Sequence, residues 1–133
     1  MSKPKCQMTN QILSSNDKRK YDLEERTAIF GESVIDFART LPRDVVVLPL
    51  ISQVVRSSTS VGANYMEADC AESKKDFRHK IGICKKEAKE TTHWLRMIAR
   101  ACPDKKEGCE NLWREAHEFV LIFSAIIRKN NGE

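Results

Sequence analysis

Apolar residues recur at intervals of three, four and seven along four segments of this chain, and this spacing marks one face of an α-helix in each segment. Residues that interrupt or start helices separate the segments. Pro42 and Pro103 lack the backbone N–H that a helix interior requires. Ser73, with Asp76 three residues later, is suited to cap a helix that follows it. The predicted helices span residues 21–41, 49–68, 74–101 and 105–129.

Length and composition favour a single helical domain. A chain of 133 residues can bury a core without disulfide or metal support. Charged residues make up 32% and aromatic residues 7%, a mix that favours helices over a β-sandwich. Because the connections are short, successive helices should be antiparallel. We therefore expect an all-α, antiparallel up-down-up-down four-helix bundle over residues 21–130, preceded by a mobile basic arm over residues 1–20.

Small and hydroxyl-bearing residues crowd the second predicted helix, in the stretch "RSSTSVG" at residues 56–62. The stretch keeps helical spacing, with small residues where a core side chain would stand. Gly62 costs roughly 1 kcal/mol of helix propensity against alanine, so it should have a packing reason. We expect a neighbouring helix to approach closely there. The face in question carries Ile51, Val55, Ser58, Gly62 and Tyr65.

A polar row follows the same helix through Arg56, Ser60, Asn64 and Glu67. Carboxylates at Glu67 and, on the next helix, Glu87 could act as acids or bases. We expect them instead to pair with Arg56. A partly buried pair of this kind can fix the register of two helices without adding net stability. These five residues form the predicted structural polar cluster.

Basic residues gather on one side of the third predicted helix. At about 100° per residue, six of them fall within roughly an 80° sector, nearly opposite the core stripe, and form a ridge about 40 Å long. A polyanion is a reasonable partner for the ridge, and its binding would depend on salt. The alternative is an ordinary solvated face. The ridge lacks stacking aromatics, so contact would show little sequence preference. The ridge residues are Lys74, Arg78, Lys85, Lys89, Arg96 and Arg100, and the core stripe is Phe77, Ile81, Cys84, Ala88, Leu95, Ala99 and Cys102.

Apolar residues outside the main stripes form two side stripes, each with a tryptophan. Trp94 lies beside the core stripe of the third helix, and Trp113, Val120 and Ile127 recur every seven residues along the fourth. Such an excess of apolar surface favours contacts between subunits. The alternative is a core that is wider than the main stripes.

Catalytic and metal-binding patterns are weak. Glu90 and His93 have the Glu-x-x-His spacing of a di-iron bundle, but His117 lacks the matching glutamate. Cys102 and Cys109 are too far apart for the usual zinc knuckle. No phosphate-binding glycine loop or nucleophile motif occurs. We therefore predict no enzyme activity, no metal, no cofactor and no small-molecule substrate.

Cysteine usage and hydropathy bear on the compartment. The five cysteines are an odd number without a CxxC pair, and in a reducing compartment they should be free thiols. Cys84 and Cys102 should be small buried apolar residues. No apolar run approaches the roughly 18 residues that span a bilayer, and the polar N-terminus lacks a signal-peptide pattern. We expect a cytoplasmic protein.

Two stretches carry a family resemblance. "QVVRSSTSVGANYMEADCAESKKDF", residues 53–77, and "GICKKEAKETTHWLRMI", residues 82–98, resemble the bacterial four-helix-bundle proteins known as ribosomal-RNA intervening-sequence proteins. The similarity spans residues 30–129. Its most specific positions are Arg56 through Ser60, Asn64, Glu67, Ser73 through Phe77, and Glu87. Ala68 stands where the family pattern has glycine.

The resemblance implies a ring of five subunits without enzyme activity, and some members are encoded within large-subunit ribosomal RNA genes. A more distant relative, the accessory variability protein of diversity-generating retroelements, binds a reverse transcriptase and its RNA. The predicted function is therefore a homo-oligomeric, pentameric accessory protein that binds RNA or a ribonucleoprotein through the ridge. The alternative is a protein-interaction scaffold, built around Trp94 and Trp113, that binds no nucleic acid.

Overall fold

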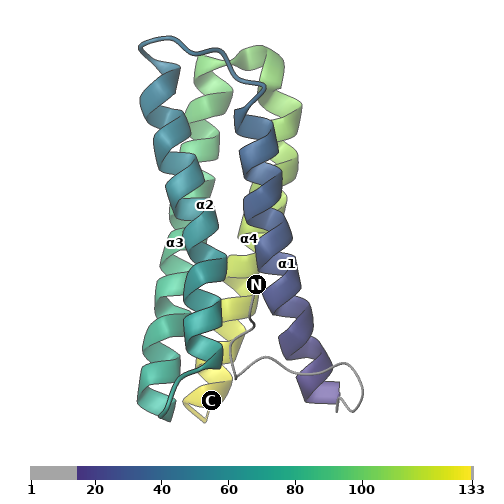
Figure 1. The fold of residues 1–133 in the computed structure, drawn as a ribbon, viewed down its shortest axis with the longest axis vertical. Helices are drawn as coiled ribbons and strands as arrows, with labels where there is room; N and C mark the ends of the chain where they lie inside the picture. The colour runs from purple at the N-terminus through teal and green to yellow at the C-terminus, as the bar shows by residue number, and fades with distance from the viewer. Residues whose placement is uncertain (1–14, 133) are drawn as a thin grey trace, which may run out of the picture.

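The structure is a computed structural model that describes residues 15–132, and it is a four-helix bundle. Successive helices run in opposite directions (Figure 1), which confirms the predicted all-α architecture. Each long helix packs against two others, and among the described residues α1 does not contact α3, so these two lie at opposite corners of the bundle. The helices are α1 Ser15–Ala38, α2 Val47–Asp69, α3 Lys74–Ala101 and α4 Lys106–Asn130, with a short 3₁₀ helix η1 Pro103–Lys105 before α4.

Side-chain caps explain where α3 and α2 begin. Ser73 accepts a hydrogen bond at 3.0 Å from the backbone N–H of Asp76, so α3 begins where predicted. The second helix begins at Val47, two residues before the predicted Pro49. Asp44 explains the difference, because its Oδ1 accepts hydrogen bonds from the backbone N–H groups of Val46 and Val47 at 3.0 and 2.9 Å.

The first helix differs from the prediction at both ends. It begins at Ser15, so residues 15–20 are helical instead of part of an arm, and residues 1–14 lie outside the described part of the chain. It ends at Ala38, three residues before the predicted Leu41. Leu41 is nevertheless buried, because a turn closed by its N–H on the Ala38 carbonyl carries it back to the core.

The core fills the space between all four helices. Phe30 of α1 and Phe119 of α4 meet edge to face, with ring centroids 5.4 Å apart. On α2 the buried face is rotated from the predicted one, since Ile51 and Val55 are only half-buried. Within residues 15–132, no helix is long and apolar enough to cross a membrane. The largest fully buried apolar side chains are Phe30, Val34, Val47, Val54, Val61, Ile81, Leu95, Ile98, Phe119 and Phe123.

The small residues of α2 admit α1 at close range, as predicted. A Cβ added to Gly62 would lie 3.3 Å from Thr27 Oγ1 and 3.4 Å from the Thr27 carbonyl carbon. A Cβ at Gly31 of α1 would lie 3.5 Å from the Cα of Thr59. The backbones of α1 and α2 therefore approach at two neighbouring points where glycine replaces a side chain.

The cysteines fall into two groups. Cys84, Cys102 and Cys109 are free and buried, which confirms the prediction for Cys84 and Cys102. Burial raises the pKa of the Cys84 thiol to about 12 and that of Cys109 to about 11, so both stay protonated at neutral pH. Cys70, at the end of α2, is disulfide-bonded, so the expectation of a free thiol is wrong there. Cys6 lies outside the described residues.

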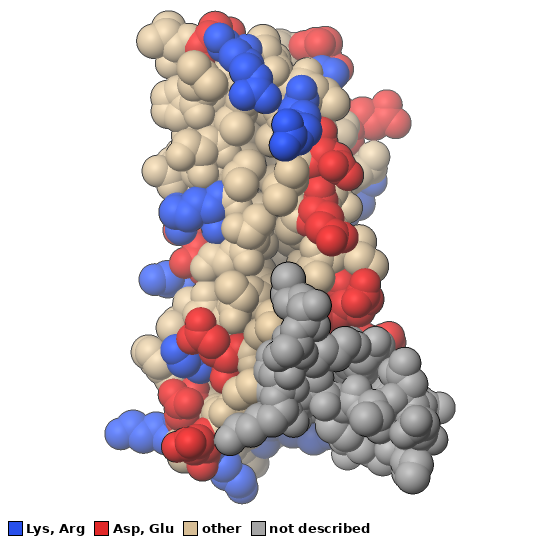
Figure 2. All heavy atoms as spheres, in the orientation of Figure 1, with Lys and Arg blue, Asp and Glu red and all other residues tan. Residues whose placement is uncertain are grey.

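Charge is divided unevenly among the helices. The third helix carries nine lysines and arginines against three acidic residues. From residue 22 to its end, α1 carries five acidic residues and one arginine. Figure 2 shows the resulting column of acidic side chains along α1. Because α1 and α3 occupy opposite corners, the bundle has an acidic corner and a basic corner.

Candidate nucleic-acid interface

The six ridge residues all belong to α3, a helix of 28 residues that is capped at its start by Ser73. Lys85 is half-buried, and the other five are exposed. From Lys74 to Arg100 the ridge extends about 40 Å at the helical rise per residue. The helix therefore presents the positive charges as one continuous strip along the length of the bundle.

The ridge lies beside the core stripe instead of opposite it, so this part of the prediction is wrong. At the helical rotation per residue, the centre of the ridge is only about 100° from the centre of the core stripe. Arg96 lines a hollow between α3 and α4 together with Ala99, a core-stripe residue. Arg78 Nη1 donates a hydrogen bond at 2.8 Å to Asn131 Oδ1, just beyond α4. The ridge thus borders α4, whose side chains share its surface.

The ridge cations lack acidic partners among the described residues. The ion pairs there involve Arg26, Arg56 and Lys80, and none involves a ridge residue. Arg26, for comparison, binds Glu115 through two hydrogen bonds of 2.8 and 2.7 Å. The ridge charge is therefore uncompensated within the described part of the chain, which leaves it available to an external anion.

A glycine opens the middle of the ridge. A Cβ added to Gly82 would meet nothing within 4 Å, in contrast to Gly62. Gly82 lines a shallow hollow on the outer side of α3 together with Lys85, Lys86 and Lys89, and with Glu90 and His93 at its end. No packing contact within the described bundle accounts for a glycine there. The helix backbone is therefore accessible beside three lysines.

The predicted polar cluster separates into three distinct contacts. Arg56 bridges α2 to two carboxylates of α3: its Nη1 lies 3.2 Å from Glu87 Oε1, and its Nη2 pairs with Glu90 Oε2. Glu87 is only 8% exposed. Glu90 Oε2 also accepts a hydrogen bond at 2.8 Å from Trp94 Nε1. This group fixes the register of α2 against α3 at mid-helix.

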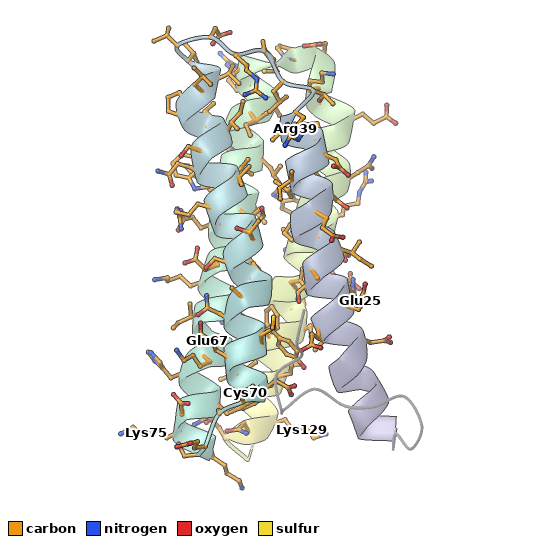
Figure 3. The ribbon with its side chains drawn as sticks, in the orientation of Figure 1. Glu25, Arg39, Glu67, Cys70, Lys75 and Lys129 are labelled. Atoms are coloured by element: carbon orange, nitrogen blue, oxygen red, sulfur yellow. The ribbon has the colours of Figure 1, made fainter. Side chains whose placement is uncertain are left out.

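The other members of the cluster lie farther along α2. Asn64 Nδ2 donates to the Ser60 carbonyl at 2.8 Å and lies 3.0 Å from Ser60 Oγ. Glu67, which Figure 3 labels near the lower end of α2, pairs with Lys80 Nζ at 2.7 Å, so it does not join Arg56. The distance along the helix explains this: Glu67 is about three turns from Arg56.

Sequence reasoning missed two α3 members of the α2–α3 contact, Glu90 and Thr91. Thr91 Oγ1 lies 2.8 Å from Ser57 Oγ, and both residues are fully buried. Glu90 shares Arg56 with Glu87, as described above. Both follow Glu87 at three- and four-residue steps, which puts them on one helix face. That spacing could have indicated from the sequence that Glu90 and Thr91 face α2 together with Glu87.

The four side-stripe residues have different environments. Trp94, Val120 and Ile127 are half-buried and pack against the core, as the wider-core alternative anticipates. Trp113 is 40% exposed. Its ring stacks on His117 with centroids 4.9 Å apart and an interplanar angle of 13°. Trp113 therefore presents indole surface beside the α3–α4 hollow, which it also lines.

Comparison with known proteins identifies the family. Residues 19–125 match the family described as 23S rRNA-intervening sequence protein. The chain belongs to this family. A crystal structure from Bacteroides thetaiotaomicron, described as a protein with unknown function from the S23 ribosomal protein family, is similar with a TM-score of 0.73 and 29% identity. The similarity covers 80% of this chain and 98% of that chain. Among curated proteins, none matches this chain.

Residues that could serve catalysis or metal binding are dispersed in this intervening-sequence family member. Within residues 15–132, no group of three or more histidine, cysteine, aspartate or glutamate side chains is placed to hold a metal ion. Glu90 is committed to Arg56 and Trp94, and His117 is stacked on Trp113. Burial raises the pKa of Cys102 and Cys109, which disfavours the thiolate that zinc requires.

Proposed function

We propose that this protein is a non-enzymatic, homo-oligomeric four-helix bundle that binds RNA through the basic ridge of α3. The ridge would hold the phosphate backbone through Lys85, Lys89, Arg96 and Arg100. Lysine and arginine side chains contact phosphates without reading the bases, so we expect affinity with little sequence preference. The partner is RNA, free or in a ribonucleoprotein. By resemblance to the retroelement accessory protein, a reverse transcriptase is a further partner to test.

The observation that carries the proposal is the uncompensated charge of the ridge. Six cations follow one helix, and among the described residues none of them has a carboxylate partner. The chain has 19 acidic against 23 basic residues. Five of the acidic residues lie on α1 between residue 22 and its end, away from the ridge. Segregation of this kind creates a surface potential that attracts polyanions. The family description, which refers to a ribosomal RNA insertion, supports RNA as the polyanion.

Two features support self-association, in a ring of five by resemblance. Apolar side chains remain exposed on the first two helices, among them Ile29, Leu48 and Met66. The side-stripe residues Trp94, Val120 and Ile127 pack against the core on one side but, being half-buried, leave part of their apolar surface accessible on α3 and α4. Surfaces of this composition are typical of subunit contacts. A ring would also repeat the ridge and multiply its contacts with one RNA strand.

RNA affinity measured across a salt series tests the proposal. We expect the logarithm of the association constant to fall linearly with the logarithm of salt concentration. The triple variant Lys85→Gln/Lys89→Gln/Arg96→Gln should lower the magnitude of the slope by about 2, because each single-strand phosphate that is no longer neutralised reduces it by about 0.7. Fluorescence anisotropy with a labelled single-stranded RNA measures both the association constant and the slope.

A matched control removes the same charge elsewhere. Arg39 and Lys129 lie near opposite ends of the bundle (Figure 3), and Arg43 follows α1. The variant Arg39→Gln/Arg43→Gln/Lys129→Gln should retain most of the slope. An association constant that does not change with salt, or an equal reduction of the slope in both triple variants, would refute binding through the ridge.

The alternative function is a protein-interaction scaffold, and one observation favours it. At the turn before α2, Val45 is 86% exposed and Val46 is 62% exposed. Exposed valines at one end of a bundle suit an apolar protein partner. A partner that stays bound after nuclease treatment and in high salt, together with wild-type RNA binding too weak to measure, would favour the scaffold over the RNA-binding protein.

A further inference from the structure

The hollow between α3 and α4 combines an aromatic ring with a basic rim. Leu95 and Ala99 of α3 provide apolar wall, and Trp113 of α4 lines the same space. Three cations stand around it, Arg96 from the ridge and Lys106 and Arg114 from α4, against one carboxylate, Glu110. The hollow is therefore positively charged at its edge, apolar inside, and continuous with the ridge.

Trp113 is preorganised to stack. Its ring is held by His117, which lies almost parallel to it at 4.9 Å between centroids. At the same time 40% of the residue is exposed, so the indole is held in one orientation and still has surface available to a ligand. The other tryptophan, Trp94, differs in both respects: it packs against the core, and its Nε1 donates a hydrogen bond to Glu90.

The rim cations are suited to phosphate. Among the described residues, neither Arg96 nor Lys106 forms an ion pair, and Arg114 donates a hydrogen bond only to the neutral side chain of Asn111, at 3.0 Å. If an apolar surface of a partner protein docked on this hollow, it would bury the three rim cations without a compensating anion, and such burial is costly. A nucleotide offers both parts at once, a flat base for the indole and anionic phosphates for the rim.

We propose that this hollow binds an unstacked base of single-stranded RNA. The base stacks on Trp113, while Arg96, Lys106 and Arg114 hold the flanking phosphates. Bases in an RNA duplex are already stacked and cannot reach the indole, so the site discriminates single strands from duplexes. The inference rests on the proposed RNA-binding function and specifies the form of RNA that is bound. It assigns Trp113 to the ligand in place of its predicted role in a subunit contact.

Tryptophan fluorescence tests the stacking directly. In a Trp94→Phe background, Trp113 is the single remaining tryptophan of the two in the chain. We expect a single-stranded 12-mer of oligouridylate, whose bases are largely unstacked, to quench its emission, and a 12-base-pair RNA duplex at equal phosphate concentration to leave it nearly unchanged. Trp113→Ala should weaken oligouridylate binding about tenfold, and Trp113→Phe less, because a phenyl ring still stacks.

Controls separate stacking from a general reduction of apolar surface. Leu121→Ala removes another exposed apolar side chain of α4, 55% exposed, and should leave RNA affinity unchanged. The salt dependence of Trp113→Ala should equal that of the wild type, since the substitution removes no charge. Light scattering should give the same mass for Trp113→Ala as for the wild type.

Each contrary result has its own meaning. If the wild type binds RNA with the expected salt dependence but Trp113→Ala binds equally well, the stacking site is overturned and the proposed function stands. If the wild type shows no salt-dependent RNA affinity, both fail. A reduced mass for Trp113→Ala would place Trp113 in a subunit contact and overturn the site. Equal quenching by duplex RNA, or by an oligoglutamate peptide, would overturn base stacking as well.

Discussion

Two glycines in helix interiors, Gly62 and Gly82, have opposite environments. Gly62 faces α1, where a Cβ would press against the backbone of Thr27. Gly82 faces outward, where a Cβ would meet nothing within 4 Å. Both sacrifice helix propensity. Packing inside the described bundle accounts for Gly62, whereas no contact there accounts for Gly82. The open backbone at Gly82 is the space into which the proposed RNA ligand would fit.

Alanine substitutions at the two glycines should therefore have effects of opposite sign. Gly82→Ala should raise the free energy of unfolding by about 1 kcal/mol, because it gains propensity without a clash. Gly62→Ala should lower it by about 1 kcal/mol, because overpacking against a backbone outweighs the same gain. Urea unfolding followed by circular dichroism measures both. Equal stabilisation by the two substitutions would show that α1 and α2 are not in close contact at Gly62.

At the scale of the helices, α2 and α3 are joined by polar as well as apolar contacts. The buried hydroxyls of Ser57 and Thr91 lie 2.8 Å apart, and the residue before Ser57, Arg56, spans Glu87 and Glu90. Polar contacts of this kind are satisfied in one register only, whereas apolar side chains tolerate sliding. They should thus select the alignment of the two helices that carries Lys85 and Lys89 outward.

Removal of the Arg56 guanidinium should destabilise the bundle by leaving the buried Glu87 carboxylate without its partner. The expected decrease in the free energy of unfolding for Arg56→Met is about 1–2 kcal/mol, less than for a fully buried pair, because the Arg56 side chain is 46% exposed. Adding Glu87→Gln to this variant should recover part of the decrease. A double-mutant cycle from chemical unfolding gives the coupling.

The Lys80–Glu67 pair provides the control for that cycle. The Glu67 side chain is 58% exposed, so Lys80→Met should change the free energy of unfolding much less than Arg56→Met does. Equal decreases at the exposed and the buried pair would argue that Arg56 contributes only general surface charge.

At the scale of the whole molecule, the bundle is polarised between its corners. Among the residues that the structure describes, the acidic corner at α1 and the basic corner at α3 do not touch, because α2 and α4 separate them. This arrangement keeps the acidic side chains of α1 away from the ridge, where they would reduce its positive potential.

Self-association should couple stability to protein concentration. For an oligomer near five times the chain mass of 15.2 kDa, the midpoint of thermal unfolding should rise with concentration, because mass action favours the assembled, folded form. Light scattering gives the mass, and calorimetry over a hundredfold concentration range gives the shift. A monomer mass together with a constant midpoint would contradict the homo-oligomer.

Sequence alone accounted for the architecture and for much of the local detail. Helical periodicity, Pro42, Ser73 and Pro103 identified four helices, and the Gly62 stretch was correctly interpreted as a close helix contact. These features follow from local rules, because periodicity and caps depend on residues within a few positions of each other. The start of α2 was misplaced because an aspartate three residues upstream, Asp44, caps it.

Only the tertiary structure decided which neighbours the chemical groups have. The sequence placed Lys85, Lys89 and Arg96 on one side of a helix, but the packing of α4 beside α3 decided that Arg96 shares a hollow with Trp113. It likewise separated Glu67 from Arg56 and gave Arg56 a second carboxylate in Glu90. The physical reason is that spacing along one helix fixes direction about its own axis, whereas partners on another helix depend on the rotation and register of the packed pair.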